Sequence, residues 1–212
     1  MSVAAGFAVR AAMPDAIAVL VAGVEAHGYA VVRNLLPAAV IAGLRRRVLS
    51  LDNAGALTQA GIGRGNARRE RAEIRGDRIH WLDDSPQGRA ETAAFVLLRD
   101  LRSECNRALL LGLFEFEGHY ALYPAGASYG RHRDRFADDD ARVLSCVLYL
   151  NDGWRADEGG ALRLYVGGAA ALDVVPAGGT LVVFLADAFD HEVLPATRPR
   201  LALTGWFRRR PC

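Results

Sequence analysis

The stretch HYALYPAGASYGRHRD, residues 119–134, decides how this chain is organised, and it ends in two residue types that commonly bind metal ions. His132 and Asp134 are two positions apart in it. On an extended strand, side chains at positions i and i+2 point to the same face of the sheet. We therefore expect the imidazole and the carboxylate to reach one ion together.

Two later residues complete a candidate site. His191 lies in FLADAFDHEVLP, and Arg200 follows it closely in TRPRLALTGWF. Two imidazoles and one carboxylate form the facial triad, which leaves coordination positions open and suits Fe(II) oxygen chemistry. Arginine offers two parallel donors at fixed spacing, which suit the carboxylate of an organic acid. The residues alone leave two interpretations open, a metal site or an ordinary surface set, because such pairs also arise by chance.

The composition is that of a globular protein and excludes several function classes. A chain of 212 residues, 51% of them hydrophobic, favours a single domain over 1–212 with a substantial core. The net charge of +2 gives no case for a nucleic-acid partner. All 26 basic residues are arginine, so Schiff-base chemistry and a phosphate-binding P-loop, which both need lysine, are excluded.

The cysteines and the apolar segments bear on location. Cys105, Cys146 and Cys212 form no CxxC pair, and an odd number without a framework favours a reducing compartment. The first residues lack a charged segment before a long apolar run, and no apolar stretch is long enough to cross a bilayer. We therefore expect a cytoplasmic protein with no membrane partner. No feature of the sequence indicates an oligomeric state.

The order of predicted elements indicates an α+β fold. Helices are expected in the N-terminal part, about 14–112. One should begin at Pro14, one at Pro37, and one should cover 87–111, with a strand at 29–35 between the first two. After Gly112, short segments separated by turn residues predict a jelly-roll or barrel core over about 117–209. Those strands are expected at 119–123, 131–136, 142–150, 161–166, 172–175, 180–185, 191–194 and 200–208.

The segment 61–78 is rich in arginine and glycine and shows no clean period. It is either a solvated loop or a lid that contacts an acidic or polymeric substrate. In the last predicted strand, alternation places Arg200, Ala202, Thr204 and Trp206 on one face and the leucines with Phe207 on the other. Two aromatic residues have simple structural interpretations. Trp81 is expected to anchor the core, and His119 is expected to be packed or exposed rather than to bind iron.

The C-terminal half resembles the 2-oxoglutarate- and Fe(II)-dependent oxygenases, and more narrowly the prolyl 4-hydroxylases of the hypoxia-sensing type and their bacterial relatives. The HxD…H…R pattern carries the wider resemblance. The narrower one rests on IRGDRIHWLDD (74–84), HYALYPAGASYGRHRD (119–134), VLSCVLYLNDGW (143–154), GGALRLY (159–165) and HEVLPATRPRLALTGWF (191–207). It covers about residues 74–207 and continues more weakly into the N-terminal helices.

This resemblance implies a double-stranded β-helix with supporting helices. It implies Fe(II) held by His132, Asp134 and His191, and 2-oxoglutarate bound to the iron through its 2-oxo acid end. The far carboxylate would pair with Arg200 and accept a hydrogen bond from Tyr149. The remaining positions that match the family's pocket are Tyr123, Leu162, Thr204 and Trp206.

The resemblance also implies the reaction. O2 and 2-oxoglutarate would be consumed to give succinate and CO2, with ascorbate as a further candidate cofactor. Because halogenating relatives lack the carboxylate ligand, Asp134 favours hydroxylation. The expected substrate is a prolyl residue of a protein, and bacterial relatives suggest a translation component. Two alternatives stay open, a hydroxylase of a small molecule such as a free amino acid, and a non-catalytic sensor of 2-oxoglutarate.

Overall fold

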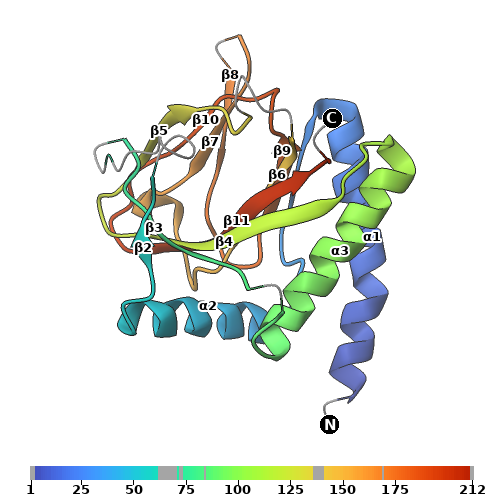
Figure 1. The fold of residues 1–212 in the computed structure, drawn as a ribbon, viewed down its shortest axis with the longest axis horizontal. Helices are drawn as coiled ribbons and strands as arrows, with labels where there is room; N and C mark the ends of the chain where they lie inside the picture. Colours follow the sequence, from blue (N-terminus) through green and yellow to red (C-terminus); the bar gives the residue numbers. More distant parts are fainter. Residues whose placement is uncertain are drawn as a thin grey trace.

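The computed structural model describes residues 3–61, 71, 74–83, 85–135, 141–168 and 170–210. Helices precede most of the strands along the chain, as Figure 1 shows. The elements are α1 (Val3–His27), β1 (Tyr29–Val32), α2 (Ala38–Asn53), β2 (Thr58–Gln59), β3 (Arg78–Trp81), α3 (Arg89–Leu109), β4 (Glu115–Tyr123), β5 (Tyr129–His132), β6 (Arg142–Tyr149), the short 3-10 helix η2 (Ala156–Glu158), β7 (Leu162–Gly167), β8 (Ala170–Val174), β9 (Leu181–Leu185), β10 (His191–Val193) and β11 (Arg200–Arg208).

The strands form two antiparallel sheets. The larger sheet has the order β1-β9-β6-β11-β4-β3-β2, and the smaller one has the order β5-β10-β7-β8. The jumps in strand number mean that neighbours in each sheet come from distant parts of the chain. Side chains between the sheets, among them Tyr149, Leu164 and Phe184, form one of the two apolar clusters. The predicted mixture of helices with an antiparallel β core is confirmed.

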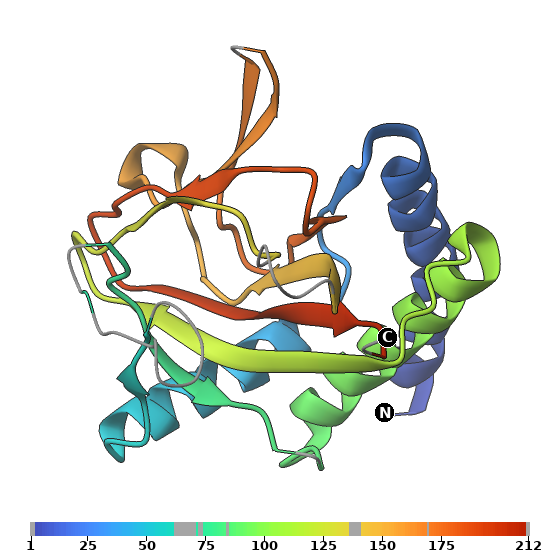
Figure 2. The same ribbon diagram turned by 45° about the horizontal axis from the view of Figure 1, so that its top comes forward.

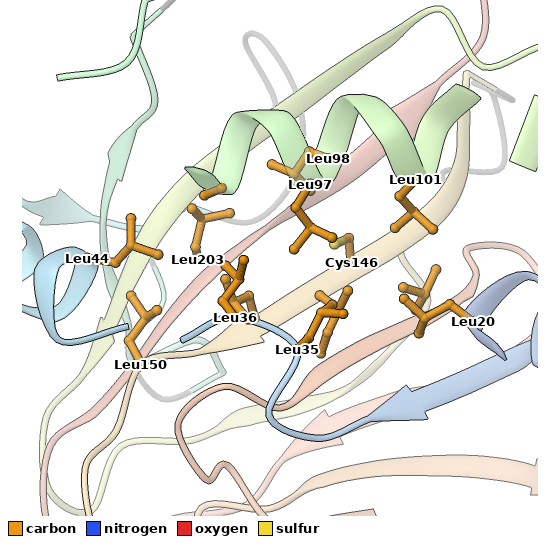
Figure 3. Packing of buried hydrophobic residues seen from close by; sticks show 14 of the residues in the cluster. Leu20, Leu35, Leu36, Leu44, Leu97, Leu98, Leu101, Cys146, Leu150 and Leu203 are labelled. Atoms are coloured by element: carbon orange, nitrogen blue, oxygen red, sulfur yellow. The ribbon is translucent and has the colours of Figure 1, made fainter. Parts of the chain in front are cut away.

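The three helices cover the outer face of the larger sheet, and the second apolar cluster lies beneath them (Figures 1 and 2). Figure 3 shows members of this cluster from several elements, with Leu97 of α3 next to Cys146 of β6, Leu101 of α3 above Leu20 of α1, and Leu203 of β11 at the other side. Full burial of a leucine side chain contributes roughly 1.5–3 kcal/mol. This packing makes the larger sheet a rigid support for whatever its opposite face carries.

Strand β11 divides its side chains between the two faces of the larger sheet, as the alternation predicts. Leu201, Leu203 and Phe207 belong to the cluster under the helices. Ala202 belongs to the cluster between the sheets, and Arg200, Thr204 and Trp206 face the same side. A single strand therefore anchors the helical layer with one set of residues and supplies a cavity wall with the other.

Two expectations from the sequence are wrong. Helix α1 begins at Val3, and Pro14 lies inside it rather than at its first turn. Because Met13 and Ile17 on either side of Pro14 are both buried in the helical cluster, packing continues through the proline and offsets the hydrogen bond that it lacks. Trp81 is not a core anchor, since 45% of its surface is exposed.

Two further statements concern the chain as a whole. Among the described residues, no helix combines the length and the apolar character needed to cross a bilayer. Most of the arginine-rich segment 61–78, which we considered as a lid, lies outside the described residues. Its described C-terminal end, Ile74–Arg78, leads directly into strand β3.

Candidate active site

His132, Asp134 and His191, called the triad below, meet between the two sheets. Their ligand atoms all lie within 4.8 Å of one another. Nε2 of His132 is 3.5 Å from Oδ1 of Asp134, and Nε2 of His191 is 3.5 Å from Oδ2 of the same carboxylate. Strand pairing explains the meeting, because β10 runs antiparallel to β5 with His191 directly opposite His132. We expected Asp134 on a strand over 131–136, but β5 ends at His132 and Asp134 lies in the following bend.

Both imidazoles are oriented by backbone carbonyls. Nδ1 of His132 lies 2.8 Å from the Gly130 oxygen, and Nδ1 of His191 lies 3.3 Å from the Phe189 oxygen. A carbonyl can only accept, so each Nδ1 carries a proton, and Nε2, which faces Asp134, is the nitrogen left for a metal ion. The Tyr129 ring also stacks on His132, with centroids 3.6 Å apart. The tautomers are therefore the ones that metal ligation requires.

The carboxylate of Asp134 is fixed from a second direction. Ser145 on β6 donates a hydrogen bond of 2.6 Å to its Oδ2. Burial by itself raises the pKa of Asp134, but His191, His132 and the Ser145 hydroxyl outweigh it and hold that pKa well below its ordinary value. For His191, burial is the largest cause and lowers the pKa of its imidazole. The triad thus presents one carboxylate and a neutral His191 ring, as a divalent cation prefers.

Arg200 forms the second part of the site. It is only 3% exposed, and its Nε donates to the Gly160 oxygen at 2.9 Å. Its guanidinium carbon lies 5.0 Å from the Tyr149 ring centre and 5.1 Å from that of Tyr123. Among the described residues no acidic side chain forms an ion pair with Arg200, and the buried Tyr149 hydroxyl has no hydrogen-bond partner. A buried cation beside an unpaired hydroxyl suits the carboxylate of a small organic acid.

The residues predicted from the sequence converge on one cavity of about 60 Å³. Tyr149 is the exception: it is fully buried behind Arg200 and is not part of the cavity wall. The Thr204 hydroxyl donates to the Cys146 oxygen at 3.2 Å, and the Arg142 guanidinium lies 3.4 Å from the Trp206 ring centre. The predicted residues that line the cavity are Tyr123, His132, Asp134, Leu162, His191, Arg200, Thr204 and Trp206.

Sequence reasoning missed several residues that line the cavity or hold its ligands. Asp77 is completely buried and forms a two-pronged ion pair with Arg75, at 2.8 and 3.1 Å. The Arg75 guanidinium in turn lies 4.9 Å from the centre of the Tyr129 ring that stacks on His132. Ser145, which holds Asp134, was also missed. The motif IRGDRIHWL contained Arg75 and Asp77, but its spacing gave no sign that they approach a site built from later strands.

Comparison with known proteins identifies the family. Residues 118–208 match the model of the 2OG-Fe(II) oxygenase superfamily. The human prolyl hydroxylase EGLN3 is 31% identical over 188 residues, which cover 85% of this chain and 78% of the relative. The chain spans 33 to 42% of the length of other, longer mammalian relatives.

Two solved structures are similar along most of the chain. A Pseudomonas putida prolyl-4-hydroxylase has 44% identity and a TM-score of 0.83, covering 92% of this chain and all of that one. A Trichoplax adhaerens prolyl hydroxylase in complex with a hypoxia inducible factor peptide fragment has 27% identity and a TM-score of 0.81, covering 91% of this chain and 88% of that one.

Fold, site and relatives agree. The chain belongs to the 2-oxoglutarate- and Fe(II)-dependent oxygenase superfamily, and its two sheets are the jelly-roll core of that fold. Within the superfamily it groups with the prolyl hydroxylases. Proteins of this superfamily need Fe(II), 2-oxoglutarate and O2. The residues present fit these groups: the triad has the donors that iron takes, and Arg200 with the Tyr149 hydroxyl lacks the anionic partner that 2-oxoglutarate would supply.

Proposed function

We propose that the protein is a 2-oxoglutarate-dependent dioxygenase that hydroxylates a prolyl residue of a protein. The observation that carries the proposal is the juxtaposition, in one cavity, of the triad and the buried Arg200, which has no acidic partner among the described residues. The Pseudomonas putida and human relatives, which are prolyl hydroxylases by name, support the prolyl target. The Trichoplax adhaerens enzyme, solved with a peptide, supports a polypeptide substrate.

In this proposal the chain's residues bind and orient. His132, Asp134 and His191 hold Fe(II), while the carbonyls behind the imidazoles and the Ser145 hydroxyl fix the ligands. Arg200 and the Tyr149 hydroxyl bind the far carboxylate of 2-oxoglutarate. When bound, iron, 2-oxoglutarate and O2 supply the oxidising chemistry: 2-oxoglutarate loses CO2, one oxygen atom enters the succinate formed, and the other enters a substrate C–H bond.

The remaining lining residues shape the cavity. Tyr123, Leu162, Thr204 and Trp206 wall it with mostly apolar surface, which limits the entry of water. The described cysteines, Cys105 and Cys146, are buried free thiols, which suits the reducing cytoplasm that we propose as the location. A translation-related target and a stimulation by ascorbate both stay predictions.

The test is an incubation of the purified protein with Fe(II), 2-oxoglutarate, O2 and an array of peptides with a central prolyl residue. Mass spectrometry should find peptides heavier by one oxygen atom, with an equal amount of succinate. Free proline and other free amino acids form the comparison, and Asp134→Ala is the inactive control. Turnover of free amino acids alone would replace the proposal by a small-molecule hydroxylase. Binding of 2-oxoglutarate without succinate in any mixture would indicate a sensor.

A protein target is then sought directly. Lysate proteins incubated with the active enzyme and with Asp134→Ala are digested and compared for oxidised prolyl peptides. We expect one or a few sites rather than general oxidation. Enrichment among components of the translation machinery would support the target class suggested by the sequence, and enrichment elsewhere would correct it.

A further inference from the structure

His119 on β4 is buried in the cavity wall. Within the part of the chain that the structure describes, its two ring nitrogens make no hydrogen bond that would stabilise the fold. The residue is 1% exposed and lines the same cavity as the triad. Among the described residues, neither ring nitrogen has a hydrogen-bond partner. Buried polar groups are paired in the great majority of cases, so each exception calls for an explanation. A histidine with both nitrogens unpaired in a substrate cavity is such an exception.

The surroundings keep this imidazole neutral. Burial is the largest cause and lowers the pKa of His119 to about 3, and the nearby Arg75 and Arg142 act in the same direction. Asp77 and Asp134 oppose them without restoring the ordinary value. A neutral imidazole has one N–H donor and one acceptor nitrogen. At physiological pH the ring therefore offers a free acceptor inside the cavity.

In the larger sheet His119 lies on β4, between the strands that carry Trp206 and Trp81. Ser145, which holds Asp134, pairs with Trp206 of β11, while the neighbouring Thr204 pairs with His119 of β4. His119 in turn pairs with Trp81 of β3, which lies next to the edge strand β2. Its ring is 4.9 Å from the exposed Trp81 ring and 5.6 Å from the Trp206 ring. A substrate that entered along this row of strands would pass two indoles with His119 between them.

The other strong acceptors in the wall are already engaged. Both oxygens of Asp77 accept from Arg75. Asp134 accepts from Ser145 and faces both triad imidazoles. The free nitrogen of His119 is therefore the acceptor best placed to take an N–H from a ligand. An Xaa–Pro peptide bond carries no N–H, but the residues on either side of a prolyl residue do.

We propose that His119 is a substrate-binding residue that accepts a hydrogen bond from the main-chain N–H of a residue adjacent to the target prolyl residue. This inference rests on the proposed function and deepens it. The ring binds peptide backbone rather than a particular side chain, and its other nitrogen can donate to a substrate carbonyl. The neighbouring indoles pack on the apolar proline ring. A free amino acid has no such amide, so His119 selects for polypeptides.

The first test compares His119→Leu with wild type on the best peptide from the prolyl array. Leaving one buried hydrogen-bonding group of the substrate unpaired should raise the KM for the peptide about tenfold or more. The KM for 2-oxoglutarate should change much less than the KM for the peptide. Because the substitution removes two unpaired polar atoms from the interior, the midpoint of thermal unfolding should not fall. His119→Gln, which keeps an acceptor, should recover part of the peptide affinity.

His80 on β3 is the matched control. Its Nδ1 lies 3.0 Å from the Ala56 oxygen, and it does not line the cavity. His80→Leu should lower the unfolding midpoint and leave the KM for the peptide unchanged, the opposite pattern to His119→Leu. A fall in the midpoint without a rise in KM for His119→Leu would make the ring a packing residue and overturn the inference.

The second test needs no protein variant. Each amide next to the target prolyl residue that carries an N–H is replaced in turn by an ester, which removes that donor. One of the two esters should raise the KM of the wild-type enzyme about tenfold and have little further effect on His119→Leu, as expected for two partners of one bond. No effect of either ester on wild type would overturn the inference while leaving the proposed function intact. If wild type hydroxylates no prolyl peptide of the array, the proposed function fails, and the peptide ligand of His119 fails with it.

Discussion

Replacement of Arg200 tests the cosubstrate site most directly. A carboxylate that enters a buried pocket loses its hydration, and only a matched cation with good hydrogen bonds offsets that loss. Removing one partner of a buried charge pair costs about 3–5 kcal/mol, on the order of a hundredfold to a few thousandfold in affinity. Tyr149 would still offer its hydroxyl, so we expect the lower part of this range for Arg200→Ala. Arg200→Lys should retain only part of the 2-oxoglutarate affinity, because the point charge of lysine cannot replace the two parallel donors of arginine.

Arg198 provides the matched control two positions away. It makes an ion pair of 3.0 Å with Glu158, donates to the Asp152 oxygen and lies over the Trp154 ring at 4.3 Å, all away from the cavity. Arg198→Ala should therefore leave 2-oxoglutarate affinity within about twofold, as expected for a partly exposed pair.

The assay is anaerobic calorimetry of 2-oxoglutarate binding to the Mn(II)-loaded protein. Metal affinity, measured first, should be equal in wild type and in the three arginine variants. The thermal midpoint of the metal-free protein should fall little in Arg200→Ala, because the variant loses one bond to Gly160 but no longer buries an unpaired cation. A large loss of 2-oxoglutarate affinity in Arg198→Ala together with a small loss in Arg200→Ala would refute the assignment of Arg200 to the cavity face of β11. Equal binding by all three proteins would refute a carboxylate site at Arg200.

Three further predictions concern the metal ligands, Gly160 beside Arg200, and the buried Tyr120 hydroxyl. Alanine at any triad position should abolish Mn(II) binding in calorimetry while leaving the far-UV circular dichroism spectrum unchanged. Ser145→Ala should weaken Mn(II) binding about 10- to 100-fold, because the Ser145 hydroxyl only orients Asp134. Unchanged Mn(II) binding in all four variants would contradict the metal site. Gly160→Ala should destabilise the fold by roughly 1–3 kcal/mol, because Gly160 has φ +74° and an added Cβ would lie 3.0 Å from both Ala196 and Trp154. It should also weaken 2-oxoglutarate binding, because the same Cβ would lie 3.4 Å from Cδ of Arg200. Chemical unfolding and the same calorimetry decide it. Burial and the bond to Glu91 raise the pKa of Tyr120, so its stabilisation is present below the unfolded value of about 10 and lost as pH rises further. The loss of stability above that pH should be smaller in Tyr120→Phe, and identical alkaline unfolding curves would refute this.

Periodicity and motif spacing were sufficient to predict the core elements. The alternation of β11 follows from leucines that must face the helices, and the observed strand Arg200–Arg208 has the predicted bounds. The predicted helix at 87–111 is α3, Arg89–Leu109, and its Cys105 is buried. In these segments the local pattern and the tertiary packing favour the same structure, so the sequence suffices.

The residues that sequence reasoning missed depend on contacts between distant segments. The role of Ser145 depends on β6 lying beside the bend that holds Asp134, and nothing in VLSCVLY distinguishes that serine from a core substitution. Trp81 reads as core by residue type, but β3 lies near the edge of its sheet, so tertiary position decided its exposure. Pro14 favours a helix start locally, and packing on both sides of it overrides that preference.

Within the described part of the chain, three buried polar groups in or beside the cavity lack a partner that a ligand could supply. Among the described residues, the Tyr149 hydroxyl and the His119 ring have no hydrogen-bond partner, and Arg200 has the Gly160 oxygen but no acidic partner. Each lowers the stability of the empty protein, and each regains its hydrogen bonds when a ligand supplies the missing group. A ligand that binds only the folded state adds about 2.7 kcal/mol of stability at a hundred times its Kd. The helical layer behind the larger sheet compensates for the cost while the cavity is empty, so the same β-strands can carry a dense apolar core on one face and unpaired polar groups on the other.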